Sequence, residues 1–107
     1  MTQQVVALDL GGTKTTAALV EVDGASARVL RRGTRPTPAP EGAAAVLASA
    51  VSLAAEVVDA GPAAAPVAIG LAAAGVVDPF RGVVTHATDH LPGWPGTDLA
   101  AAFRARF

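Results

Sequence analysis

Two apolar segments near the amino terminus, separated by a pair of glycines, constrain the fold more than any other feature. Residues 5–10 form a short apolar run that leads into Gly11-Gly12, which predicts a buried strand followed by a tight turn. The next run, residues 15–22, ends at Asp23-Gly24, and an Asp-Gly pair between two such runs is a strong hairpin signal. With residues 28–34 as a third strand, the sequence predicts a three-stranded antiparallel meander.

Beyond the meander, helical and extended patterns alternate. Three prolines interrupt regular structure between positions 36 and 40, and apolar spacings of three and four then predict a helix over residues 41–60, ended by Gly61-Pro62. A strand is expected at 67–73 and a shorter hairpin or edge strand at 82–87. A last helix, capped by Thr97, is expected to run from Asp98 toward Phe107 without a stop signal. This order predicts an α/β layer with an unfinished sheet.

Composition limits the functions that the chain can have. Its 107 residues suffice for one modest domain, and 51% hydrophobic with 4% aromatic residues predicts a core of Ala, Val and Leu with little stability to spare. The 8 basic and 9 acidic residues form no basic stripe, which argues against nucleic acid as a partner. The chain has no cysteine, no signal-peptide pattern and no apolar run of the ~20 residues that a membrane helix needs. A cytoplasmic protein without membrane partners is therefore expected.

The segment from Asp9 to Thr15, Asp-Leu-Gly-Gly-Thr-Lys-Thr, carries the most chemical information. Glycines let the backbone approach a phosphate, whose oxygens successive N–H groups can bind. Thr13 and Thr15 can add hydroxyl donors, and Lys14 can add positive charge. Asp9 can hold a hydrated Mg²⁺ that bridges nucleotide phosphates.

The alternative interpretation of this segment is a plain hairpin turn with Asp9 as a turn residue, and spacing alone does not separate the two. The segment is not a Walker A loop, because Thr13 stands between Gly12 and Lys14. It does not fit the G-x-G-x-x-G pattern either.

Three segments form an ordered pattern over nearly the whole chain. Residues 6–20 surround the glycine pair, and residues 69–79 read Ile-Gly-Leu-Ala-Ala-Ala-Gly-Val-Val-Asp-Pro. Residues 82–84, Gly-Val-Val, lead to Leu-Pro-Gly-Trp at 91–94 and then to an amphipathic helix. The pattern resembles the ROK family of sugar kinases and sugar-responsive repressors, in the hexokinase and actin superfamily. The resemblance implies an actin-like ATPase (ribonuclease H-like) fold, with residues 1–107 as a partial N-terminal domain and the C-terminal domain absent.

The resemblance also assigns roles to single residues. Those that match the family's nucleotide-phosphate loop are Asp9, Gly11, Gly12, Thr13 and Lys14, with Thr15 beside them. Gly75 matches the loop that approaches the sugar, and Thr88 and Asp89 lie where the family contacts the sugar. Many members have Asn directly before Leu-Pro-Gly-Trp, where this chain has His90, so the sugar contact stays open between Asp89 and His90.

The activity that the resemblance implies is transfer of the γ-phosphoryl group of ATP, with Mg²⁺, to a hexose or an N-acetyl amino sugar. In the family, the catalytic base lies in an Asn-Asp pair after the helix that ends here, so it is expected beyond Phe107. The adenosine-binding half and a His/Cys zinc site lie downstream as well. The 107 residues alone are therefore expected to be inactive, and a homodimer is one assembly that the resemblance allows.

Two other function classes compete with the kinase. A sugar-responsive regulator of the same family carries an N-terminal helix-turn-helix, and the eight residues before Asp9 are too few for one. A non-catalytic module that binds sugar or phosphate is the second alternative. Trp94, held between two prolines, is expected to anchor its loop against the core rather than to stack on a sugar. His86 and His90 are spaced i, i+4, but the sequence offers no third metal ligand near them, which argues against a metal site.

Overall fold

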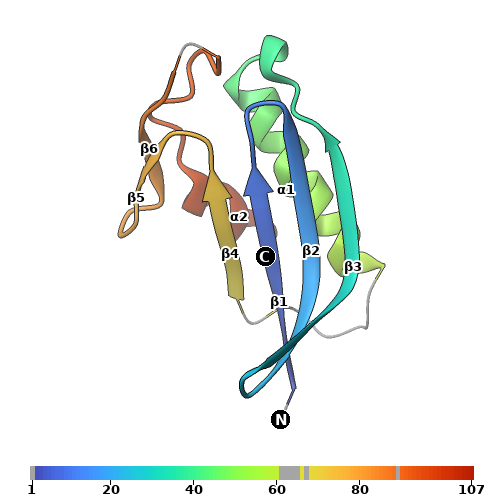
Figure 1. Ribbon diagram of the computed structural model, residues 1–107. Helices are drawn as coiled ribbons and strands as arrows, with labels where there is room; N and C mark the ends of the chain where they lie inside the picture. Colours follow the sequence, from blue (N-terminus) through green and yellow to red (C-terminus); the bar gives the residue numbers. More distant parts are fainter. Residues whose placement is uncertain (1, 61–65, 67, 89) are drawn as a thin grey trace.

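A four-stranded sheet forms the centre of the computed structural model, which describes residues 2–60, 66, 68–88 and 90–107 (Figure 1). The strand order is β3-β2-β1-β4. Antiparallel pairing joins β1 (Gln3–Leu10) to β2 (Lys14–Asp23) and β2 to β3 (Ser26–Pro36). β4 (Ala68–Ala73) pairs in parallel with β1. The predicted three-stranded meander is confirmed, and one parallel strand extends it.

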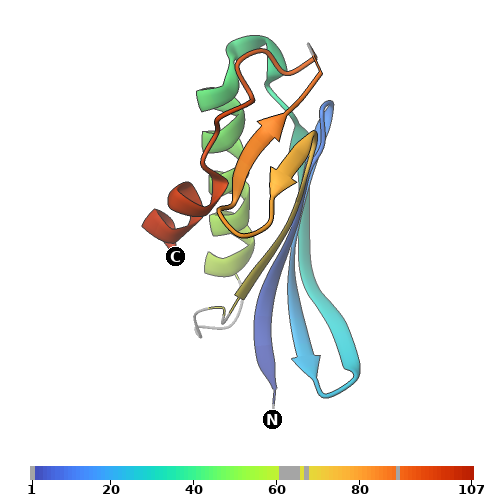
Figure 2. The same cartoon turned by 90° about the vertical axis from the view of Figure 1, so that its left-hand side faces the viewer.

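The remaining elements lie along one side of this sheet and at one end of it. A short 3-10 helix, η1 (Ala39–Glu41), precedes the long helix α1 (Ala43–Asp59). β5 (Val76–Asp78) and β6 (Val83–His86) form a separate antiparallel pair, and α2 (Leu99–Arg106) follows. Figure 2 shows α1 and α2 on the same side of the sheet. The mixed α/β fold therefore has one helical layer on one sheet face.

Two details differ from the sequence prediction. No strand was predicted at residues 76–78, but they form β5, because Val77 pairs with Val84, which is buried in the core. The predicted helix cap at Thr97 is wrong. Asp98 is the N-cap of α2, and its side chain accepts the N–H of Ala101 at 3.0 Å. The expected stop signal at positions 61 and 62 lies outside the described residues.

The core lies between the sheet and α1. Side chains alternate along β1, so Val6, Leu8 and Leu10 are buried while Asp9 is exposed. The buried residues of α1 recur at helical spacing and are Val46, Ala50, Leu53, Ala54 and Val57. The expected core of Ala, Val and Leu is confirmed, and Trp94 and Phe103 add two aromatic side chains to it. None of the helices in the described ranges is long and apolar enough to cross a membrane.

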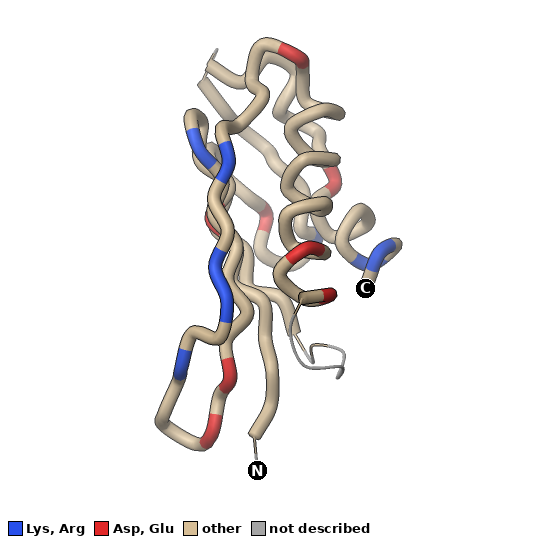
Figure 3. The backbone as a smooth tube through the Cα atoms, turned by 90° about the vertical axis from the view of Figure 1, so that its right-hand side faces the viewer, with Lys and Arg blue, Asp and Glu red and all other residues tan. Residues whose placement is uncertain are grey.

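Arginines follow β3 along the outer edge of the sheet, where Figure 3 shows a row of basic positions. Arg35 pairs with Glu56 of α1 at 2.6 Å. Arg31 donates to the carbonyl oxygen of Ala60 at 3.3 Å, which is a favourable place for a cation because helix carbonyls point there. These contacts join the edge of the sheet to α1, although each exposed ion pair contributes at most about 1 kcal/mol to stability.

Candidate functional site

The turn between β1 and β2 and the segment that follows β4 lie at the same end of the sheet (Figure 1). The turn between β1 and β2 follows the carboxyl end of β1, and the parallel strand β4 ends beside it. The N–H of Ala74 donates to the carbonyl of Leu10 at 2.8 Å, and Gly75 follows directly. Ligands of α/β sheets bind at the carboxyl ends of parallel strands. Of the expected sugar contacts, Asp89 lies outside the described residues.

The four carbonyl groups of residues 11–14, which we name the glycine turn, all have hydrogen-bond partners within the protein. Two of these partners come from Thr37, which follows β3. Its hydroxyl donates to the carbonyl of Gly11 at 2.7 Å, and its N–H donates to the carbonyl of Thr13 at 2.9 Å. One residue that is distant in sequence therefore holds the turn at two points.

The other two carbonyl groups have partners from inside and outside the turn. The N–H of Gly11 donates to the carbonyl of Lys14 at 3.0 Å, which closes the turn on itself. The carbonyl of Gly12 lies 3.1 Å from Nε2 of His90. Each carbonyl group of the glycine turn therefore already accepts one hydrogen bond from the protein, which leaves the N–H groups of the turn as the candidates for binding a ligand.

The candidate donors lie on adjacent residues of the turn. Within the described part of the chain, the N–H groups of Gly12 and Thr13 donate to no protein acceptor. Thr13 and Lys14 have exposed side chains, so a hydroxyl and a positive charge lie on the same short segment. Successive free N–H groups next to a cation favour the oxygens of a phosphate. The geometry of the turn therefore suits an anion.

Both glycines of the turn lie in close contacts, Gly11 against backbone and Gly12 against a side chain. A Cβ on Gly11 would lie 2.7 Å from the carbonyl oxygen of Lys14, which would break the turn. A Cβ on Gly12 would lie 2.8 Å from Cδ2 of His90, so the ring needs the space that a side chain would fill. Neither glycine has a positive φ, so close approach and not backbone conformation accounts for both.

Thr15 is separated from the exposed donors. Its side chain is 1% exposed, and its hydroxyl lies 2.9 Å from that of Thr37. A hydroxyl has one proton, and Thr37 gives its own to the carbonyl of Gly11, so Thr15 is the donor in this pair. In this arrangement Thr15 supports the turn from the interior and offers no donor to a ligand.

Thr37 is the residue of the site that sequence reasoning missed. It stands between Pro36 and Pro38, and the prolines were interpreted only as a break in regular structure. Thr37 is only 7% exposed. Buried polar groups in proteins are nearly always hydrogen-bonded, and the bonds of Thr37 to the turn meet this requirement. The sequence did offer one signal for Thr37, because it is a hydroxyl residue between two prolines, which restrict the backbone around it.

Asp9 lies at the end of β1, on the sheet face opposite α1. It is exposed and lies across from Thr16 of β2 and Ala72 of β4. The described residues contain no group of three or more side chains that could hold a metal. A Mg²⁺ at Asp9 therefore has to take its other ligands from water and phosphate oxygens, which is how this ion is usually bound at nucleotide sites.

The loop between β6 and α2 is anchored by a buried residue and has exposed polar residues. Trp94 is 0% exposed, and its Nε1–H donates to the carbonyl of Ala74 at 2.9 Å, so the predicted anchor is confirmed. Gly75 has a φ of 93°, and a Cβ there would collide with the carbonyl oxygen of His86. Thr88 and His90 are exposed on the same loop. The structure thus brings Gly75 and this loop close to the glycine turn.

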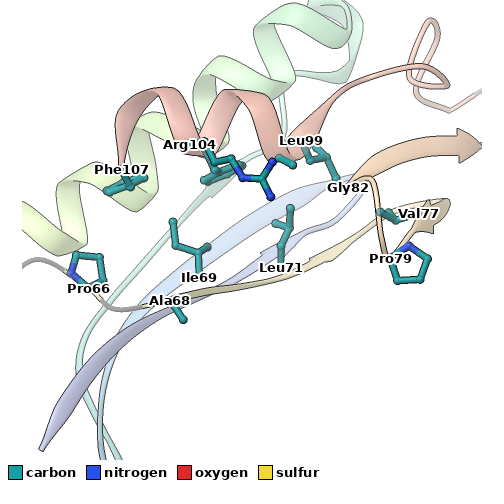
Figure 4. A pocket seen from close by; sticks show the side chains of 12 residues that line it. Pro66, Ala68, Ile69, Leu71, Val77, Pro79, Gly82, Leu99, Arg104 and Phe107 are labelled. Atoms are coloured by element: carbon teal, nitrogen blue, oxygen red, sulfur yellow. The ribbon is translucent and has the colours of Figure 1, made fainter.

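A cleft of about 640 Å³ lies elsewhere, between β4 and α2 (Figure 4). Its lining is mainly apolar and includes Ile69, Leu71 and Phe103. None of the predicted site residues lines it. The cleft lies along the edge strand β4 and has few polar groups that could orient a sugar or a phosphate, so the glycine turn remains the candidate site.

Comparisons with known proteins bear on the family and the fold of the chain. The sequence model of the ROK family matches residues 5–107. The crystal structure of an inorganic polyphosphate/ATP-glucomannokinase from Arthrobacter sp. strain KM is similar, with a TM-score of 0.75 and 28% identity over 97% of this chain. Two structures of an Aquifex aeolicus PPX-GPPA enzyme show the fold alone, with TM-scores of 0.50 and identities of 10% and 9% over 69% of this chain. The matched region spans 27% and 26% of the lengths of these two Aquifex aeolicus chains. A search of curated proteins found no match.

The fold and the glycine turn define an N-terminal domain of the actin-like ATPase class. The chain belongs to the ROK family. It spans 40% of the length of the glucomannokinase chain, so it corresponds to less than half of that protein.

Proposed function

We propose that this chain supplies the phosphate-binding turn and part of the sugar site of an ATP-dependent kinase that acts on a hexose or an N-acetyl amino sugar. The glycine turn carries the proposal, because all four of its carbonyl groups are bound within the protein, while two adjacent N–H groups donate to no acceptor among the described residues. Membership of the ROK family and the likeness to a polyphosphate/ATP-glucomannokinase support this reaction class.

Each group of the site has a role in this proposal. The N–H groups of Gly12 and Thr13 bind phosphate oxygens, and the exposed Lys14 adds positive charge. Asp9 holds Mg²⁺, which neutralises charge on the phosphates when it is bound. Gly75 and the loop with Thr88 and His90 face the sugar, with Asp89 included on the family resemblance. Such a site works mainly by positioning the reactants, so a preformed turn is what the reaction needs.

The catalytic base is assigned to no residue of this chain. The family resemblance places it in an Asn-Asp pair that follows α2, beyond Phe107. A second domain would close over the sugar and exclude water. The 107 residues alone should therefore bind the donor without transferring phosphate. The free N–H groups favour a kinase over a sugar-responsive regulator, because a regulator needs a sugar site but no phosphate site. Cytoplasmic localisation and ATP as the donor belong to the same proposal.

The test is calorimetric titration of the purified chain with ATP, with and without Mg²⁺. We expect Mg²⁺-dependent binding that Asp9→Asn weakens by about ten- to a hundredfold, the range for losing a charge-assisted contact. Asp78→Asn is the matched control, because Asp78 accepts the N–H groups of Phe80 and Arg81 through Oδ1, which Asn retains. ATP binding that ignores both Mg²⁺ and Asp9→Asn would contradict the proposal.

A turnover assay with hexoses and N-acetyl amino sugars, using ATP or inorganic polyphosphate as donor, completes the test. The chain alone is expected to show no sugar-dependent consumption of either donor. Turnover that survives rigorous purification and disappears in Asp9→Ala would overturn the expected inactivity and place the base within the 107 residues.

A further inference from the structure

We propose that His90 is a positioning residue that aims the glycine turn at a bound phosphate. Its Nε2 lies 3.1 Å from the carbonyl oxygen of Gly12, across 78 positions of sequence. This role differs from the sugar contact that the family resemblance suggests for His90. It rests on the proposed function, since it concerns the same phosphate-binding turn.

The protonation of the ring follows from its partner. A carbonyl oxygen only accepts hydrogen bonds, so Nε2 of His90 carries the proton and donates it to Gly12. The peptide between Gly12 and Thr13 is planar and trans, so the N–H of Thr13 points opposite to the bound carbonyl. By holding the carbonyl of Gly12, His90 therefore sets the direction of a free N–H that is a candidate phosphate donor.

The position of Gly12 supports this interpretation. Its φ is not positive, so the backbone conformation alone does not require glycine. The steric reason is the ring of His90, whose Cδ2 would lie 2.8 Å from an added Cβ. The glycine and the histidine are therefore complementary parts of one contact.

The contact also connects two parts of the site. The loop that carries His90 is anchored by Trp94, which binds the carbonyl of Ala74 next to the end of β4. Thr88 lies on the same loop, and its carbonyl accepts the N–H of Leu91 at 3.3 Å. A sugar that shifts this loop therefore also shifts the Gly12 carbonyl and changes the affinity of the turn for phosphate. By linkage, a phosphate bound to the turn changes the affinity for the sugar by the same factor.

Histidine variants of the full 107-residue chain test the proposal by calorimetric titration with Mg²⁺ and ATP. His90→Ala should weaken ATP binding about three- to tenfold, the range for one hydrogen bond. His90→Gln should restore most of the affinity, because its side-chain amide can donate from a similar position. His86→Ala is the matched control and should leave binding unchanged, since His86 is exposed and its Nδ1 contacts Thr85. Equal affinity of His90→Ala and the unaltered chain would overturn the proposal.

A double variant separates the contact from other effects of each residue. Gly12→Ala should displace the ring without unfolding the chain, because the atom in conflict belongs to a side chain that can rotate away. If both residues act through one contact, Gly12→Ala combined with His90→Ala should bind ATP no more weakly than Gly12→Ala alone. If the double variant instead loses affinity by the product of the two single factors, the proposal is contradicted.

Amide NMR spectra of the ligand-free chain give a readout that does not depend on ATP. His90→Ala should shift the amide resonance of Thr13, and His86→Ala should not. If the unaltered chain binds no ATP, the proposed function fails and this inference falls with it. If the chain binds ATP and the Thr13 resonance stays in place in His90→Ala, only the role of His90 is overturned.

Discussion

Two supports hold the glycine turn, and they differ in their environment. Thr37 lies on the inner side, at 7% exposure, and bonds two carbonyl groups and one hydroxyl. His90 lies on the outer side, is exposed, and bonds one carbonyl group. Breaking a buried hydrogen bond leaves polar groups without water, whereas water can replace an exposed one. We infer that the inner support governs whether the turn forms, and the outer support governs how it is aimed.

The largest effect is expected where the outer loop reaches the core. Trp94→Ala should lower the free energy of unfolding by about 3–5 kcal/mol, because it empties a fully buried site and leaves the carbonyl of Ala74 unpaired. Urea denaturation measures this loss. If the variant does not fold, Trp94→Phe keeps most of the volume and should show a smaller loss. Phe80→Ala, at a side chain that is 95% exposed, is the control and should stay within about 0.5 kcal/mol. Similar losses in Trp94→Ala and Phe80→Ala would contradict the anchoring role.

A smaller loss is expected from the inner support. Thr37→Val should cost about 1–3 kcal/mol, because it leaves the Gly11 carbonyl and the buried Thr15 hydroxyl without their partner. Thr15→Val combined with Thr37→Val should cost less than the sum of the single variants, because the orphaned hydroxyl is then removed. Denaturation of the three variants measures this coupling.

The chain contains a matched control for this pair. Thr34 bonds Thr16 at 3.0 Å through the same groups on neighbouring strands, but at an exposed position. Thr34→Val should therefore change stability by no more than about 0.5 kcal/mol. Equal losses in Thr34→Val and Thr37→Val would show that burial does not distinguish the two hydroxyl pairs, and the comparison between inner and outer supports would fail.

The smallest effect on stability is expected at the outer support. His90→Ala should change the free energy of unfolding by no more than about 0.5 kcal/mol, because water can satisfy the Gly12 carbonyl. The same variant is expected to weaken ATP binding, so the two measurements should diverge. A destabilisation as large as that of Thr37→Val would make His90 a structural support like Thr37.

Local signals predicted much of the fold. Apolar alternation and the Asp23-Gly24 turn identified the meander, and helical spacing identified α1, because these patterns act within a few residues of each other. Local reasoning failed at β5, which depends on its partner β6. It also chose Thr97 over Asp98 as the cap of α2, because either residue type can cap a helix and the backbone path decides between them.

The candidate site could be predicted only in part. The glycine pair, Asp9 and the small residues after β4 carry short-range signals, so their grouping at one sheet end follows once parallel pairing of β1 and β4 is known. Thr37 carries no such signal, because its role depends on where the end of β3 meets the glycine turn. The burial of Thr15 follows from the face of β2 that packs on α1.

The sequence by itself determined the chemical groups at the turn: two glycines, a carboxylate, a lysine and two hydroxyls within seven residues. Only the tertiary structure decided which of these groups face a ligand. The bonds that make this choice join positions 22, 26 and 78 residues apart. The physical reason is that turn formation and alternation are local, whereas the partner of a polar group is set by whichever segment the sheet brings beside it.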